Sequence, residues 1–127
     1  MLQKIICIID DDPIYKLITK KLIQKTKLYS ETIEFNNGNE ALIYFESASS
    51  LPDILLLDIE MPEMDGWEFL DEFCKLEKER KKESTVYIAS SSIAIDDKMK
   101  AKKYECVKDF LSKPINLEKL KQIAEQV

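Results

Sequence analysis

The chain has 127 residues, of which 45% are apolar, and these values suit one domain with one packed core. Its formal net charge of −5 argues against nucleic-acid binding by this domain. The first apolar run is too short for a signal peptide, and no segment approaches the roughly 18 apolar residues of a membrane span. We therefore expect a cytoplasmic protein that has no contact with a membrane.

Two residue types narrow the chemistry further. The chain contains no histidine, which excludes histidine general bases, histidine metal ligands and a role as a phosphohistidine donor. The three cysteines, Cys7, Cys74 and Cys106, are widely spaced and form no C-x-x-C pair. This pattern argues against a zinc site and a disulfide framework. We expect all three to be reduced, buried thiols.

The first predicted unit is a strand followed by a helix. Residues 4–9 form an apolar run that ends directly before Asp10, Asp11 and Asp12. Asp12 is a typical N-cap with Pro13 at the first helical position, and the helix is expected to reach about Lys25. Apolar residues recur along it at helical spacing, namely Ile14, Leu17, Ile18 and Leu22.

The second unit combines a short strand over 32–35, an Asn-Asn-Gly turn and a helix over 39–47. The third strand, over 54–57, is apolar without alternation, which is typical of a strand buried on both faces. Asp58 follows it directly. After a loop with Pro62 and Gly66, the next helix is expected over 67–81.

The last two units complete the pattern. Strands are predicted over 86–89 and 107–111, and helices over 96–103 and 117–126. Alternating strands and helices favour an α/β fold, with a single doubly wound parallel sheet of five strands, right-handed crossovers and helices on both faces. In such folds ligands bind outside the carboxyl ends of the strands. Asp58, Ser90, Lys113 and the first acidic cluster all lie at that edge.

Several carboxylates at one sheet edge repel each other unless a cation is present. Oxygen ligands suit Mg²⁺, and a carboxylate beside Mg²⁺ and a lysine suits phosphoryl transfer. Asp12 is interpreted as a helix cap rather than a ligand, because Pro13 follows it.

The motifs that carry this chemistry also resemble those of a known family. Segments 8–13, 55–62, 64–66 and 110–114 resemble, in order and at strand ends, a two-component response-regulator receiver domain of the stand-alone chemotaxis type. The resemblance covers essentially the whole chain, 1–127. It implies a flavodoxin-like sheet with strand order 2-1-3-4-5, and a switch that catalyses only its own phosphorylation and dephosphorylation.

The resemblance also implies a role for each site residue. Asp58 resembles the phosphoacceptor, which receives its phosphoryl group from a histidine kinase or a histidine phosphotransfer protein. Asp11 and, through water, Asp10 resemble the Mg²⁺-binding pair, with the backbone carbonyl of Glu60 as a further ligand. Lys113 resembles the lysine that pairs first with Asp58 and then with the phosphoryl group.

Signal transmission is implied to depend on two further residues. Ser90 resembles the hydroxyl that hydrogen-bonds the phosphoryl group, although Ser91 and Ser92 are adjacent. Phe110 resembles the aromatic switch residue, with core packing as the alternative. The Lys113–Pro114 peptide bond is expected to be cis. Glu60 and Ser92 are predicted to tune the phosphoryl lifetime, with plain loop exposure as the alternative.

One departure from the family pattern affects the partner. The small residues usual before the last strand are replaced by residues 103–109, so the downstream protein is not inferred. Three other functions remain open. A Mg²⁺-dependent phosphohydrolase would use a D-x-D pair such as Asp10 and Asp12, and usually a lid. A flavodoxin would need a phosphate loop, which three aspartates would repel. A degenerate receiver would act only as an adaptor.

Overall fold

The computed structural model describes residues 4–61, 64–80, 84–91 and 95–126. Its five strands are β1 (Lys4–Ile9), β2 (Tyr29–Phe35), β3 (Ile54–Leu57), β4 (Thr85–Ser90) and β5 (Val107–Ser112). Its five helices are α1 (Pro13–Thr26), α2 (Gly38–Ser47), α3 (Gly66–Glu79), α4 (Ile95–Ala101) and α5 (Leu117–Gln126). All strand pairs are parallel, in the order β2-β1-β3-β4-β5, which confirms the predicted sheet.

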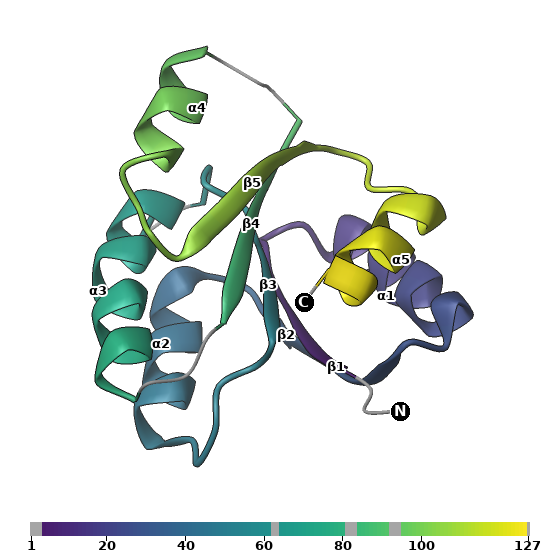
Figure 1. The fold of residues 1–127 in the computed structure, drawn as a ribbon, viewed down its shortest axis with the longest axis horizontal. Coiled ribbons are helices and arrows are strands. Elements are labelled where there is room, and N and C mark those ends of the chain that lie inside the picture. The colour runs from purple at the N-terminus through teal and green to yellow at the C-terminus, as the bar shows by residue number, and fades with distance from the viewer. Residues whose placement is uncertain (1–3, 62–63, 81–83, 92–94, 127) are drawn as a thin grey trace.

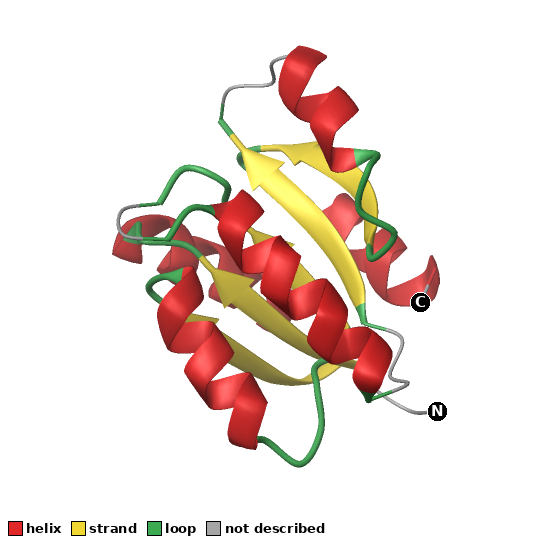
Figure 2. Cartoon of the chain, turned by 90° about the vertical axis from the view of Figure 1, so that its left-hand side faces the viewer, coloured by secondary structure: helices red, strands yellow, loops and turns green. Residues whose placement is uncertain are grey.

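Helices cover both faces of this sheet. Helices α2, α3 and α4 lie on one side, and α1 and α5 lie on the other (Figure 1). Figure 2 views the molecule from the side of α2, α3 and α4. Each face encloses its own apolar core, and every residue of the central strand β3 is buried, as its unbroken apolar run predicted.

Helix α1 forms as predicted, but most of its apolar stripe does not face the core. Ile14, Leu17 and Ile18 are 68%, 54% and 53% exposed. The buried positions of this helix are instead Lys16, Thr19, Ile23 and Thr26. The spacing of the apolar residues correctly predicted a helix, because it follows the helical period. It did not identify the face of the helix that packs on the sheet.

Two strand boundaries differ from the prediction in ways that matter for the site. β4 includes Ser90 and β5 includes Ser112, and these two residues are paired partners in the sheet. Ser90 is therefore the last residue of β4 rather than the first residue beyond it. At the other edge, β2 begins at Tyr29, three positions before the predicted start at Thr32, because its pairing with β1 reaches back to Lys4.

Helix α3 begins with a capping box, which the sequence analysis did not identify. The Asp65 carboxylate accepts from the Glu68 N–H at 2.9 Å, and the Glu68 carboxylate accepts from the Asp65 N–H. Gly66 is required here by close packing, since a Cβ atom would lie 2.6 Å from the Ile59 Cα. The loop between Asp58 and α3 is thereby held against the end of β3. The predicted helix end at Lys81 lies outside the described residues.

The expectation of three reduced, buried thiols is wrong for two of the cysteines. Cys74 and Cys106 form a disulfide with a Cα–Cα distance of 5.9 Å, within the range that disulfides span. Their separation of 32 residues concealed the pair, because only the packing of α3 beside the start of β5 brings them together. Cys7 is free and fully buried, as expected, and burial raises the pKa of its thiol.

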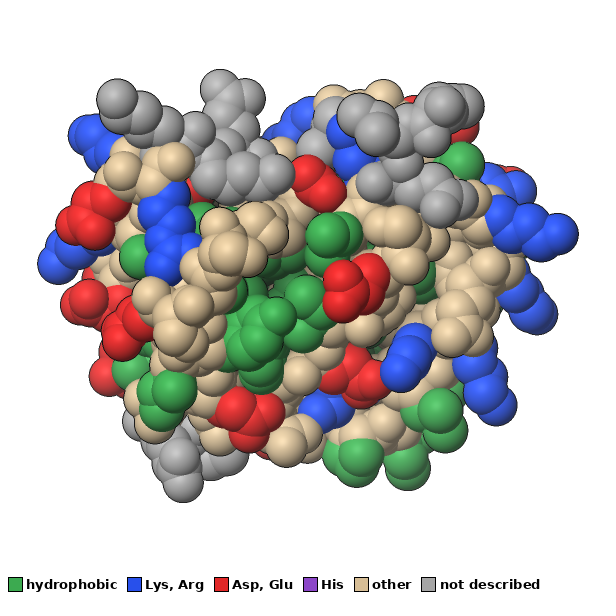
Figure 3. Space-filling model, turned by 90° about the horizontal axis from the view of Figure 1, so that it is seen from below, with side chains coloured by type: hydrophobic (Ala, Val, Ile, Leu, Met, Phe, Trp, Pro, Cys, Tyr) green, Lys and Arg blue, Asp and Glu red, His purple; other side chains and the backbone are tan. Residues whose placement is uncertain are grey.

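The surface carries side chains of both charges, as expected for a sequence with 19 Lys and Arg and 24 Asp and Glu residues. On the face drawn in Figure 3, Lys and Arg side chains are interspersed with Asp and Glu side chains, and hydrophobic side chains gather near its middle and along its lower edge. None of the helices within the described residues combines the length and hydropathy that crossing a bilayer requires.

Candidate functional site

Three aspartates meet at the carboxyl ends of two neighbouring strands. β1 ends at Ile9, which is paired with Leu57, the last residue of β3. Asp10, Asp11 and Asp58 follow these ends directly, and one carboxylate oxygen from each lies within 4.8 Å of the other two. Asp10 and Asp58 are buried, whereas Asp11 is exposed. The parallel register therefore gathers the acidic cluster that the sequence predicted.

Asp12 plays a different part from its three acidic neighbours. Its carboxylate accepts from the N–H groups of Ile14 and Tyr15 at 2.9 and 3.2 Å, which makes it the N-cap of α1. Its own N–H donates to Asp10 Oδ1 at 2.9 Å. The predicted cap is confirmed, and its carboxylate is occupied by the helix end. Asp12 is therefore not placed to act as the second carboxylate of a D-x-D pair, which argues against the phosphohydrolase alternative.

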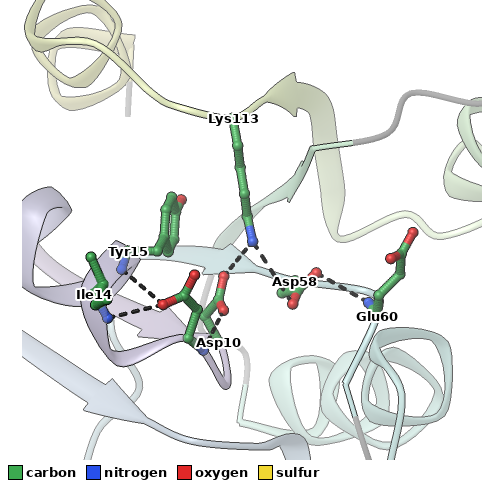
Figure 4. Close-up of polar contacts among 7 residues, drawn as sticks. Asp10, Ile14, Tyr15, Asp58, Glu60 and Lys113 are labelled. Atoms are coloured by element: carbon green, nitrogen blue, oxygen red, sulfur yellow. Dashed lines mark hydrogen bonds and ion pairs between the residues drawn. The ribbon is translucent and has the colours of Figure 1, made fainter.

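Lys113 supplies the positive charge of the site. It follows β5, and its ammonium nitrogen lies 2.5 Å from Asp10 Oδ2 and 3.8 Å from Asp58 Oδ2 (Figure 4). The resemblance implied a first pairing with Asp58, but the shorter contact is with Asp10. Asp10 is the more deeply buried carboxylate and has the greater need of a counter-ion. The Lys113–Pro114 peptide bond is cis, the geometry that the resemblance implied.

Tyr15 belongs to the site, although no sequence signal marked it. The Lys113 ammonium lies 4.3 Å from the centre of the Tyr15 ring, a cation–π geometry. Burial is the main reason that the pKa of Tyr15 is raised, and the charges of Asp10 and Asp58 add to the effect. Lys113 is thus held between a carboxylate and an aromatic face (Figure 4).

Asp58 has an unusual environment for a carboxylate. Burial raises its pKa from 3.8 to about 6, and the negative charges of Asp10 and Asp11 act in the same direction. The Glu60 N–H, which donates to Asp58 Oδ1 at 3.1 Å, and the Lys113 ammonium oppose this shift. The Glu60 side chain is exposed, and the role of its carbonyl as a ligand stays a prediction. Ser92 lies outside the described residues.

The donor set fits a small, hard cation. Asp10, Asp11 and Asp58 offer three carboxylate oxygens that converge, and two of these groups are buried. Mg²⁺ prefers oxygen ligands and retains water, which the exposed side of Asp11 allows. The same convergence is costly without a cation because the like charges repel.

Ser90 and Phe110 lie on adjacent strands and on the same face of the sheet. Ser90 is paired with Ser112, two residues after Phe110, and side chains two apart in a strand point to the same side. Ser90 is 1% exposed, and its carbonyl accepts from the Lys113 N–H at 2.9 Å. Phe110 is only partly buried and packs against the core shared with α2 and α3.

Curated relatives match nearly the whole length of this chain. The sensor histidine kinase CheAY of Helicobacter pylori is 28% identical over 96% of this chain, which corresponds to 15% of that protein. The probable methanogenesis regulatory protein FilR2 of Methanothrix harundinacea is 26% identical over 97% of this chain and 80% of its own length. The regulator NtrC of Salmonella typhimurium is 30% identical, but the chain spans only 25% of it.

Solved structures of response regulators are also similar to this chain. A two-component response regulator from Cytophaga hutchinsonii is 29% identical, with a TM-score of 0.87, and the match covers 98% of this chain and 97% of that one. A response regulator receiver protein from Dyadobacter fermentans has a TM-score of 0.83 at 24% identity, over 96% of this chain and 95% of that one, and shows the shared fold.

A family model ties these likenesses together. The model of the response regulator receiver domain matches residues 6–125, which include the acidic cluster, Asp58, Ser90, Phe110 and Lys113. Receiver domains of two-component systems act in general as phosphoacceptor switches. The chain belongs to the response regulator receiver domain family.

Proposed function

We propose that residues 1–127 form one receiver domain in which Asp58 accepts a phosphoryl group from a histidine kinase or a histidine phosphotransfer protein. One observation carries the assignment. Asp58 is a buried carboxylate that lies 3.8 Å from the Lys113 ammonium without being its nearest partner, and two further carboxylates converge on the same point. Asp10 is bonded to Lys113, and Asp11 is exposed, so each is better suited to support the reaction than to accept the group.

The step itself is a transfer between two side chains. An oxygen of the ionised Asp58 attacks the phosphorus of a phosphohistidine, and the P–N bond breaks as the O–P bond forms. Because its pKa is about 6, Asp58 is mainly ionised at pH 7 and ready to attack. Mg²⁺ held by Asp10, Asp11 and Asp58 would neutralise the negative charge on the transferred group. Lys113 would exchange its contact with a carboxylate for one with a phosphoryl oxygen.

This chemistry makes the protein a switch rather than an enzyme of metabolism. It would catalyse its own phosphorylation and dephosphorylation and turn over no other substrate. The same proposal places it in the cytoplasm, where ATP-dependent kinases work. It would pass its signal to a downstream protein through the surface near Phe110.

The apolar patch on α1, made of Ile14, Leu17 and Ile18, is the proposed docking surface for the phosphodonor. Its side chains are more than half exposed and lie on the helix that begins directly after the acidic cluster. Contiguous exposed apolar residues of this kind mark protein–protein contacts. A histidine-bearing helical protein seated there would bring its phosphohistidine to Asp58.

The phosphoacceptor is tested by intact mass after incubation with acetyl phosphate and Mg²⁺. Wild type gains one phosphoryl mass, and prior chelation of the metal prevents the gain. Asp58→Asn gains nothing, whereas Asp12→Asn, which keeps a capping side chain, labels like wild type. Labelling of Asp58→Asn to the wild-type extent would refute the assignment.

The docking surface is tested by comparing two donors. Leu17→Asp is expected to slow transfer from a phosphorylated histidine phosphotransfer protein by roughly tenfold, since it places a charge in the apolar contact. It leaves the rate with acetyl phosphate unchanged. Ile43→Asp, at a position 63% exposed on α2, is the matched control and affects neither rate. Equal transfer rates for Leu17→Asp and Ile43→Asp would contradict the docking surface.

A further inference from the structure

The connection between α4 and β5 is fastened to α3 by a ladder of side chains, which we call the clasp. Trp67, Asp71 and Cys74 lie on one face of α3, four and three residues apart. Their partners are in or after α4. The Tyr104 ring stacks on Trp67 with centroids 5.8 Å apart, the Tyr104 hydroxyl donates to Asp71 Oδ1 at 2.9 Å, and Cys106 is bonded to Cys74.

The clasp bears most directly on α4. Ile95 and Met99 are 76% and 60% exposed, and Ala101 is the buried residue of this helix. A helix with so few buried contacts belongs to the part of a fold that opens most easily. Lys100, whose ammonium lies 4.8 Å from the centre of the Trp67 ring, ties the last turn of α4 to the clasp.

The disulfide of the clasp lies at the surface, whereas the third cysteine, Cys7, is fully buried. Cys74 and Cys106 are only partly buried and line a surface pocket of about 380 Å³. Three lysines and two glutamates share its lining: Lys75, Lys78, Lys103, Glu77 and Glu105. Ammonium groups near a cysteine favour the thiolate, which is the form that exchanges with disulfides. Cys7 is fully buried and has no such access.

We propose that Cys74 and Cys106 are a reversible thiol–disulfide exchange site, which reacts with small disulfides and dithiols and sets how firmly the α4–β5 connection is held against α3. Partly exposed disulfides are the ones that exchange and regulate, whereas buried ones are structural. The inference rests on the clasp alone and does not require phosphorylation of Asp58.

The exchange balances as two displacements. The thiolate of one cysteine attacks a sulfur of a small disulfide, forms a mixed disulfide and releases one small thiolate. The second cysteine thiolate then attacks the protein sulfur of that mixed disulfide, closes the Cys74–Cys106 bond and releases the second small thiolate. Two electrons pass from the cysteines to the small disulfide, and the two released thiolates take up the two protons.

Opening the bond removes the covalent link between α3 and the α4–β5 connection. The Trp67–Tyr104 stack, the Asp71–Tyr104 hydrogen bond and the contact of Lys100 with Trp67 remain as the non-covalent contacts of the clasp. Residues 101–107 would then open more often. Cys106 accepts from the Val86 N–H at 3.0 Å through its carbonyl, so the loosening reaches the first pair of β4 and β5. The surface next to β5 thereby becomes sensitive to the thiol–disulfide balance.

The test equilibrates the native protein in glutathione buffers of increasing oxidised fraction and then traps free thiols with an alkylating agent. Intact mass is expected to show one transition from two trapped thiols to none, while Cys7 remains unmodified throughout. Hydrogen exchange of amides 101–107 is expected to be at least roughly tenfold faster in the reduced protein than in the oxidised one. Amides of β1 serve as the internal reference and exchange alike in both.

Three further samples make the result decisive. Cys74→Ala and Cys106→Ala each retain one reactive thiol, form no intramolecular bond and exchange at 101–107 like reduced wild type. Asp58→Asn shows the wild-type redox transition, which separates this site from the phosphoacceptor. The proposal is overturned if the two thiols stay free in oxidised glutathione, if excess dithiothreitol leaves the native bond closed, or if amides 101–107 exchange equally in both states.

Discussion

Lys113 bonds Asp10 at 2.5 Å and stands further from Asp58, at 3.8 Å. The pair joins the loop after β5 to the end of β1, two segments 103 residues apart in the sequence. Both side chains are largely buried, so loss of either would leave the other charge without its partner in a poorly solvated place. The Lys113 ammonium must therefore weaken its contact with Asp10 before it can bind a phosphoryl group on Asp58.

Tyr15 is expected to act as a positioning residue for this lysine. Replacing it by leucine removes the ring face 4.3 Å from the ammonium. Loss of a cation–π contact of about 0.5–2 kcal/mol is expected to lower the phosphorylation rate roughly twofold to thirtyfold. Tyr15→Phe keeps the ring and should restore the rate. Labelling by acetyl phosphate measures both variants, and equal rates for the leucine and phenylalanine variants would contradict this role.

The raised pKa of Asp58 predicts a pH-dependent stability. In the metal-free folded protein Asp58 keeps its proton up to about pH 6, whereas the ordinary value is 3.8. Between these values the folded state binds more protons, so the free energy of unfolding falls as the pH rises through the window. Above about pH 6 Asp58 is ionised in both the folded and the unfolded state, and its burial then lowers the free energy of unfolding by an amount of order 3 kcal/mol.

Asp58→Asn should remove this dependence and be more stable than wild type at pH 7 when metal is chelated. Urea denaturation between pH 4 and pH 7 gives the difference between the two proteins. That difference should grow with pH up to about 6 and then level off. Parallel curves over the whole range would show that ionised Asp58 carries no such cost.

Asp11 is expected to be required for stabilisation by Mg²⁺. Wild type should melt at a higher temperature when Mg²⁺ is present. At a Mg²⁺ concentration one hundred times the dissociation constant, the free energy of unfolding should rise by about 2.7 kcal/mol. Asp11→Asn should lose this gain while its metal-free form is as stable as wild type or more so, since one of three like charges is removed. Asp12→Asn makes the same charge change one residue away and should keep the gain. Unchanged Mg²⁺ affinity in Asp11→Asn would exclude the residue as a ligand.

Ser90 and Phe110 are expected to transmit the occupied state of Asp58. A phosphoryl group adds charge and acceptor oxygens, and movement of Ser90 toward it would free space on the face that Phe110 shares. Ser90→Ala should accept phosphate with a muted response, and Phe110→Ala should separate partner binding from phosphorylation. Amide chemical shifts of residues 95–111 with and without beryllofluoride provide the measurement. Unchanged shifts in wild type, with Asp58 occupied, would rule out this route.

The disulfide should contribute to global stability as well as to the clasp. Its cysteines are 32 residues apart, and closing a loop of that length stabilises by about 3–4 kcal/mol in the chain-entropy account. Reductant should therefore lower the free energy of unfolding of wild type in urea by a comparable amount. The Cys74→Ala/Cys106→Ala double variant should be insensitive to reductant. A wild type with the same stability in both conditions would show that the bond is energetically neutral.

Much of the fold could be predicted because its signals are local. The unbroken apolar run of β3, the Asp12–Pro13 start of α1 and the alternation of strands with helices follow from short-range sterics, capping and periodicity. The acidic cluster could also be placed, because parallel strands bring their carboxyl ends to one edge whatever the details of packing. The residues Asp10, Asp11 and Asp58 were therefore expected to meet.

Other features depend on which surfaces pack together, and no local pattern records this. The helical spacing of Ile14, Leu17 and Ile18 is the same whether that stripe faces the core or solvent, and only the docking of α1 on the sheet left it exposed. The Cys74–Cys106 bond and the position of Tyr15 beside Lys113 likewise join segments that are distant along the chain. Periodicity and capping are set by neighbours in the sequence, whereas these contacts are set by the summed packing of the whole domain.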